Sequence, residues 1–146
     1  MSALVIDAGV AVAWYVAESE GGPANGEAAL ALLSAAQRGR LILHAPQLLL
    51  PEVGNVFWKL VRFRELAPAR AARDLVLLRK TQVRVRENQE LMDDAFALAS
   101  ATGSTVYDGM YMALAQRLGL NLITTDTKLV NRVKETHPWV RSLSSL

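Results

Sequence analysis

The chain has 146 residues, 51% of them hydrophobic, with a net charge of +2 and no cysteine. This length predicts a single domain, residues 1–146, that buries enough apolar surface to fold without disulfides or thiolate-bound metal. No apolar run approaches the roughly 20 residues of a membrane span, and the amino terminus lacks a signal-peptide pattern, so we expect a soluble, cytoplasmic protein.

Short apolar stretches alternate with longer helical patterns along the chain. Strands are predicted at residues 3–6, 41–44, 82–86, 122–125 and 139–143. Helices are predicted after Asp7, at residues 24–37, 48–63, 68–79, 89–102 and 127–135, and between Asp108 and Gly119. Asn88 is expected to cap the helix at 89–102. Strands that alternate with helices favour an α/β fold, in which a mostly parallel sheet is covered on both faces.

Four acidic residues stand where these predicted elements begin or end. They are Asp7 after the first strand, Glu52 in the first turn of a leucine-rich helix, Asp108 in the first turn of a later helix, and Asp126 after the strand at 122–125. Ligand sites of parallel α/β sheets lie outside the carboxyl ends of the strands, so we expect these acids to share one edge. Any one aspartate alone is more simply explained as a helix cap, but glutamate is a poor cap, and the set of four favours a shared site.

A cluster of carboxylates requires a compensating cation. Two unit charges about 4 Å apart repel by about 4 kcal/mol at an effective dielectric constant of about 20. Because the chain has no cysteine and only two isolated histidines, an all-oxygen site would select Mg²⁺ or Mn²⁺, which activates water and holds phosphoryl oxygens. Asn55, on the helix face of Glu52, and Thr124, near Asp126, are expected to support the carboxylates.

Positive charge is concentrated in the middle of the chain. Between Lys59 and Arg86 lie nine basic and two acidic residues, a net charge of +7, whereas the rest of the chain carries −5. A basic block beside a group of acids suits a polyanion bound next to a metal site. We therefore predict RNA-backbone contacts at Arg62, Arg64, Arg70 and Arg73. The alternative is that these arginines only form the solvated faces of helices.

Four segments together resemble a known family. They are residues 4–8, 45–57, 107–115 and 122–129, which carry the four acids in order and span most of the chain. They resemble the PIN-domain nucleases and, within that group, the VapC-type toxins of type II toxin–antitoxin pairs. The resemblance implies a three-layer α/β/α sandwich and a metal-dependent endoribonuclease that leaves a 5′-phosphate and a 3′-hydroxyl.

The resemblance also implies a role for each acid. Asp7, Asp108 and Asp126 match the family's Mg²⁺ or Mn²⁺ ligands, and Glu52 would position the metal or its attacking water. It further implies a homodimer that is silenced by an antitoxin chain lying across the active-site groove.

The neighbours of Asp108 are expected to be structural. Gly109 replaces the alanine usual in the family, which costs roughly 0.5–1 kcal/mol in helix propensity. Tyr107 and Tyr111 are expected mainly to pack, although one hydroxyl could reach the groove.

Other function classes place acids at strand ends as well. Phosphotransfer receivers have paired acids early in the chain, and haloacid dehalogenases have an Asp-x-Asp motif, whereas Asp7 here stands alone. A PIN fold that only binds RNA or a partner is a further alternative. Unpaired, clustered carboxylates argue against it, because they destabilise a fold that lacks a compensating metal. An RNA-processing nuclease without a toxin role would use the same site and stays open.

Overall fold

The computed structural model describes residues 2–16 and 23–146. These residues form a five-stranded sheet whose strands are all parallel, in the order β3-β2-β1-β4-β5. The strands are β1 (Ser2–Ile6), β2 (Leu41–Pro46), β3 (Val83–Arg86), β4 (Leu122–Thr124) and β5 (Val140–Ser142). The predicted α/β fold around a mostly parallel sheet is confirmed.

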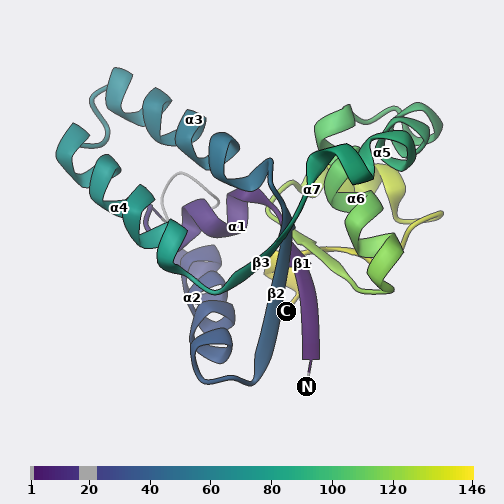
Figure 1. Cartoon of the computed structure of the whole chain (residues 1–146), viewed down its shortest axis with the longest axis horizontal. Helices are drawn as coiled ribbons and strands as arrows, with labels where there is room; N and C mark the ends of the chain where they lie inside the picture. The colour runs from purple at the N-terminus through teal and green to yellow at the C-terminus, as the bar shows by residue number, and fades with distance from the viewer. Residues whose placement is uncertain (1, 17–22) are drawn as a thin grey trace.

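Helices cover both faces of the sheet and complete the predicted α/β/α sandwich (Figure 1). They are α1 (Ala8–Ala13), α2 (Pro23–Gln37), α3 (Leu49–Arg62), α4 (Pro68–Lys80), α5 (Asn88–Thr102), α6 (Val106–Leu118), α7 (Thr127–Val133) and the short 3-10 helix η2 (Leu143–Ser145). Figure 1 shows α3 and α4 extending as a pair from one side of the sheet, with α5 and α6 on the other side. None of the described helices is long and apolar enough to cross a membrane.

The strand order reverses between β1 and β4. From β1 the chain adds β2 and then β3 on one side, and it then returns across the sheet to add β4 and β5 on the other. In open parallel sheets, ligands bind at such a reversal, outside the carboxyl ends of the strands. Asp7 directly follows β1, and Asp126 lies two residues after the end of β4, so both acids stand at this point.

The central strand, β1, pairs directly with β4. Val5 and Ile6 of β1 pair with Leu122 and Ile123 of β4, and all four side chains are buried. Continuous apolar strands are expected where helices cover both faces of a parallel sheet. This pairing holds the ends of β1 and β4 side by side, below the acids that follow them.

The predicted capping role of Asn88 is wrong. Asn88 is the first residue of α5, and Glu87 takes the cap position without a side-chain hydrogen bond. The Asn88 Oδ1 atom instead accepts a hydrogen bond from the backbone N–H of Leu48 at 3.0 Å, and its own N–H donates to Oε1 of Gln47 at 3.1 Å. Asn88 therefore ties the start of α5 to the turn that precedes α3 and Glu52.

The structure explains why position 109 is a glycine, which the sequence did not show. A Cβ atom added at Gly109 would lie 2.3 Å from the carbonyl oxygen of Ala95 in α5. No rotamer change relieves such an overlap, because both groups belong to backbones. Helices α5 and α6 thus approach each other closely one residue after Asp108, and only glycine permits this approach.

Candidate active site

Asp7 is held by bonds to both of its carboxylate oxygens. Its Oδ1 atom caps α1 by accepting from the backbone N–H of Val10 at 3.1 Å. Its Oδ2 atom accepts a hydrogen bond from the Thr124 hydroxyl at the end of β4. The same hydroxyl oxygen accepts from the backbone N–H of Asp126 at 2.9 Å. Thr124 therefore links Asp7 to the turn that carries Asp126.

Asp126 is the exposed member of the group. It is the N-cap of α7, and its Oδ1 atom accepts from the backbone N–H of Leu129 at 3.1 Å. The capping explanation thus holds for Asp7 and Asp126 in a literal sense. It does not exclude a second role, because a carboxylate has lone pairs beyond the one used in a cap.

Asp108 lies half-buried in the first turn of α6. The N-cap of this helix is Thr105, whose hydroxyl accepts from the backbone N–H of Asp108 at 3.1 Å. Burial raises the pKa of the Asp108 carboxyl above its usual range, and the nearby charge of Asp126 raises it further. The hydrogen bonds with Thr105 and the charge of Arg132 oppose this rise in the pKa only in part.

Glu52 faces the same space from α3. Burial raises the pKa of its carboxyl, the nearby hydroxyl of Tyr111 partly opposes this shift, and the charge of Asp108 adds to it. Among the described residues, no lysine or arginine forms an ion pair with Glu52 or Asp108. The two carboxylates therefore lie close to further negative charge without a paired cation.

Tyr111 lies near Glu52, Asp7 and Asp108, whereas the sequence led us to expect mainly packing, with one of the two tyrosine hydroxyls able to reach the groove. Its side chain is only 4% exposed. Burial raises the pKa of its hydroxyl far above the usual range, and the charges of Glu52, Asp7 and Asp108 add to this. Among the described residues, neither the Tyr111 hydroxyl nor Oε1 of Glu52 makes a hydrogen bond of normal geometry. The available signal was the spacing of three residues from Asp108, which places both side chains on one helix face.

The donor set fits a hard divalent cation in its chemistry. It consists of carboxylate oxygens whose mutual repulsion a cation would relieve, and it includes the buried, unsatisfied Oε1 of Glu52. As the side chains are placed here, no group of three or more acidic, histidine or cysteine side chains in the described part of the chain lies close enough to hold an ion. Side-chain adjustment would therefore accompany metal binding.

A PIN-domain family model matches residues 4–135. The chain belongs to the PIN-domain family. It is 37% identical over 131 residues to Ribonuclease VapC3 of Pyrobaculum aerophilum, covering 88% of this chain and 93% of that protein. It is 34% identical over 93 residues to Exonuclease VapC9 of the same organism, covering 64% of this chain and 66% of that protein. The resemblance noted in the sequence is confirmed.

A solved structure shows the same fold. The crystal structure of PAE2754 from Pyrobaculum aerophilum matches with a TM-score of 0.68 and 24% identity, covering 98% of this chain and 93% of that one. All four acids lie within the residues that the family model matches. The acid group therefore belongs to the part of the chain that the PIN family shares.

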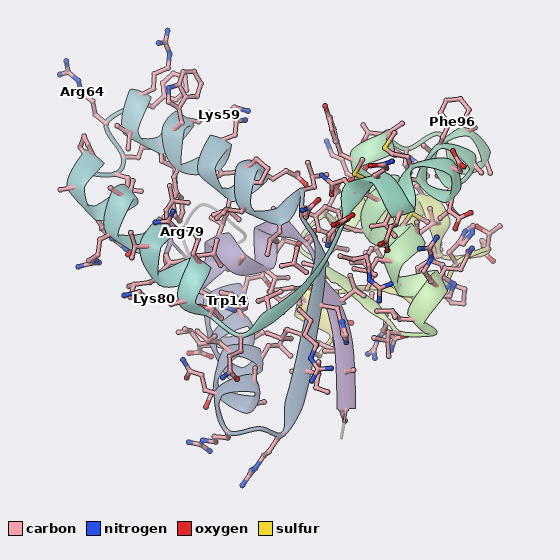
Figure 2. All side chains as sticks on the ribbon, in the orientation of Figure 1. Trp14, Lys59, Arg64, Arg79, Lys80 and Phe96 are labelled. Atoms are coloured by element: carbon pink, nitrogen blue, oxygen red, sulfur yellow. The ribbon has the colours of Figure 1, made fainter. Side chains whose placement is uncertain are left out.

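The other residues predicted to serve the site are Asn55 and the four arginines. Asn55 lies exposed on α3, one turn after Glu52. Arg62 lies 5.7 Å from the ring centre of Trp58 on the same helix. Arg64 follows α3, in a left-handed backbone conformation with φ of 59°, at the tip of the α3–α4 pair (Figure 2).

Two of the predicted arginines have structural partners instead. The Nε atom of Arg70 lies 3.6 Å from the buried Asp74 carboxylate, and Nη2 of Arg73 lies 3.2 Å from it. Arg70 also donates a hydrogen bond to the backbone carbonyl of Tyr15 at 2.5 Å. RNA contact by any of the four arginines stays a prediction.

Proposed function

We propose that this PIN domain is an Mg²⁺- or Mn²⁺-dependent endoribonuclease of the cytoplasm that hydrolyses RNA phosphodiester bonds. The main support is that Asp7, Glu52 and Asp108 lie around one buried tyrosine, with Asp126 near Asp108. The names of the relatives, Ribonuclease VapC3 and Exonuclease VapC9, point to the same class of reaction. A single catalytic domain, residues 1–146, would contain all the residues that the chemistry needs.

Each acid has a distinct proposed task. Asp7, Asp108 and Asp126 would hold the cation, which supplies an activated water and neutralises charge on the phosphoryl oxygens. Glu52 would orient the attacking water and take its proton, a task suited to a carboxyl whose pKa is raised. The water oxygen would bond to phosphorus while the bond to the 3′ oxygen breaks, and the departing oxygen would take a proton from solvent, which would leave a 5′-phosphate and a 3′-hydroxyl.

Tyr111 and Thr124 would position these groups. The Tyr111 hydroxyl is a neutral donor surrounded by acids, so it can hold one oxygen of Glu52 while the other faces the substrate. Thr124 already bonds Asp7 and the backbone of Asp126, which keeps the two strand ends in register. Asn55 would act at the rim, since it lies one turn from Glu52.

We propose that the cellular role is that of a toxin in a type II pair. In this role the chain would form a homodimer and would be silenced by an antitoxin protein that covers the acid group. Support comes from the relatives, both of which are VapC proteins by name. Growth arrest on expression, absent for Asp108→Ala and relieved by the product of an adjacent small gene, would distinguish a toxin from an RNA-processing nuclease.

The deciding experiment is cleavage of a structured RNA pool by the purified protein. Reactions contain Mg²⁺, Mn²⁺ or EDTA, and they compare the wild type with Asp7→Ala and Asp108→Ala. We expect metal-dependent cutting that both substitutions abolish. Cutting that survives in both variants would assign the activity to another site. A folded wild type that cuts none of the RNAs, and whose melting temperature no metal raises, would favour a binding role.

A further inference from the structure

A cavity of about 430 Å³ opens beside the acid group. Its walls are one side of α3 from its first turn to its last, including Glu52, Asn55 and Lys59, and the side chain of Tyr107 from α6. Glu52 is the only one of the four acids that lines it. The cavity is therefore continuous with the proposed catalytic centre but extends away from it along α3. Its volume lies in the range of small-molecule sites.

The α3 wall carries three polar side chains whose charge changes along the helix. Glu52, Asn55 and Lys59 are spaced by three and four residues, so they form one stripe along the helix. Seven residues of helix place Lys59 about 10 Å from Glu52 along the axis. The stripe thus passes from a carboxylate to an amide to a cation. No ion pair in the described part of the chain involves Lys59, which Figure 2 shows projecting from α3.

The opposite wall presents an aromatic ring. Tyr107 is 59% exposed, although it stands directly before the half-buried Asp108. No ring or cation contact among the described residues involves it. An exposed ring beside a cavity can stack on a flat apolar ligand, and aromatic side chains that stack on unpaired bases are the usual means of holding single-stranded RNA.

These groups together match one nucleotide. Tyr107 offers a stacking surface, Asn55 offers an amide that can both donate to and accept from a base edge, and Lys59 offers a charge for a phosphate. A protein segment would use the apolar part of the cavity but would leave the amide and the cation without a defined role. Continuity with Glu52 places such a nucleotide next to the phosphodiester that is cut.

We infer that this cavity binds one unpaired nucleotide of the RNA beside the scissile bond. The inference rests on the proposed ribonuclease function, because the RNA is taken to be the substrate of the adjacent acids. The base stacks on Tyr107, Asn55 bonds its edge, and Lys59 binds the neighbouring phosphate. Selectivity would then arise at α3 and α6 rather than at the arginines of α4.

Binding and cleavage are measured separately to test this. An end-labelled single-stranded oligoribonucleotide is titrated against Asp108→Asn protein in EDTA, with and without Tyr107→Ala. Loss of one stacked base should weaken binding by about 5- to 150-fold, and Tyr107→Phe should restore it. Phe96→Ala is the matched control, because Phe96 is 64% exposed but lies on α5, away from the cavity (Figure 2). It should change nothing.

A second measurement tests the phosphate contact. Lys59→Gln should reduce the slope of log affinity against log salt concentration by about 0.7, the value for one phosphate of a single strand. Lys80→Gln on α4 is the control for removing one exposed charge, and its slope should equal that of the parent.

A fully paired RNA duplex should bind more weakly than the single strand, and Tyr107→Ala should leave the affinity for the duplex unchanged.

The outcomes separate the two proposals. If Asp108→Asn abolishes cleavage but Tyr107→Ala leaves single-strand affinity unchanged, the ribonuclease stands and the nucleotide site is wrong. If no RNA is cut but Tyr107→Ala weakens single-strand binding, the site stands and the catalytic proposal is wrong. Duplex binding that is equally tight, or a Tyr107→Ala variant that loses only its antitoxin, would overturn the inference and assign the cavity to a duplex or to a protein.

Discussion

Buried and partly buried carboxylates have opposite surroundings in two regions of this molecule. Asp74 in α4 is only 1% exposed, yet Arg70 and Arg73 both lie within ion-pair distance of it. Glu52 and Asp108 are less buried, but their charged neighbours include other acids, and burial raises the pKa of both. Depth of burial alone therefore does not separate a structural acid from a catalytic one.

The two regions differ in whether the protein itself supplies the compensating positive charge. At Asp74 the protein supplies it, because Arg70 and Arg73 of the same helix form ion pairs with the carboxylate, although its Oδ2 atom makes no hydrogen bond of normal geometry among the described residues. At the acid group no described lysine or arginine forms an ion pair with Glu52 or Asp108, although the charge of Arg132 partly lowers the pKa of Asp108. Among the described residues the Tyr111 hydroxyl makes no hydrogen bond of normal geometry. A site that lowers stability unless something binds is typical of function, and the comparison predicts what substitutions in each region will do.

The largest effect is expected from Asp108→Asn. It should lower RNA cleavage by at least about 100-fold, because a lost metal ligand costs no less than a lost outer-shell partner. It should not lower the melting temperature in EDTA, since it removes a charge repelled by Asp126. Cleavage assays and thermal melts of the same preparations test both parts. A variant that loses activity and stability together would make Asp108 a structural acid like Asp74.

Gly109→Ala should displace Asp108, its neighbour on α6, without removing the carboxylate. Helix propensity alone predicts a gain of roughly 0.5–1 kcal/mol, but the added Cβ would overlap the carbonyl of Ala95. We expect a net loss of about 1–3 kcal/mol in the free energy of unfolding, the usual cost of overpacking. Urea titration measures it, and a stabilised variant would show that α5 and α6 do not approach as closely as described.

Asp74→Asn tests the structural side of the comparison. Its two arginine partners are largely exposed and can be solvated again, so the expected loss is about 1–2 kcal/mol in the free energy of unfolding. Cleavage per folded molecule should stay within about two-fold of the wild type, because no acid of the catalytic group is touched. Loss of cleavage at unchanged stability would contradict the division drawn here.

Tyr111→Phe should affect activity more than stability. Among the described residues the hydroxyl makes no hydrogen bond of normal geometry, so its removal breaks no such bond and the ring packing remains. We expect roughly ten-fold slower cleavage, as for other groups that orient a catalytic side chain, with a melting temperature at or slightly above that of the wild type. Unchanged cleavage rates would limit Tyr111 to packing.

The smallest effect is a dependence of stability on pH. In the metal-free protein the pKa values of Glu52 and Asp108 are raised above their ordinary 4.5 and 3.8. Above those values the folded state holds more protons than the unfolded state, so stability falls as pH rises through the raised values. The melting temperature of Asp108→Asn relative to wild type should therefore increase from about pH 4 to about pH 7. Added Mn²⁺ should reverse this trend, because it binds the deprotonated acids.

Sequence reasoning succeeded where a local pattern and the long-range structure agree. The strands and helices were found from apolar periodicity, with ends that differ by a few residues. The end of β2 is one such difference, because Ala45 and Pro46 pair with β3, a contact that no local pattern encodes. The prediction that Asn88 caps a helix was wrong for the same reason, because its side chain accepts a hydrogen bond from Leu48, forty residues earlier.

The sequence by itself determined the fold class, the PIN family and the identity of four acids at element ends, because periodicity and chain order are local properties. Only the tertiary structure decided which residues surround those acids. It placed Tyr111 among three of them and required glycine at position 109. Each depends on the distance between segments far apart in the chain, and packing sets that distance.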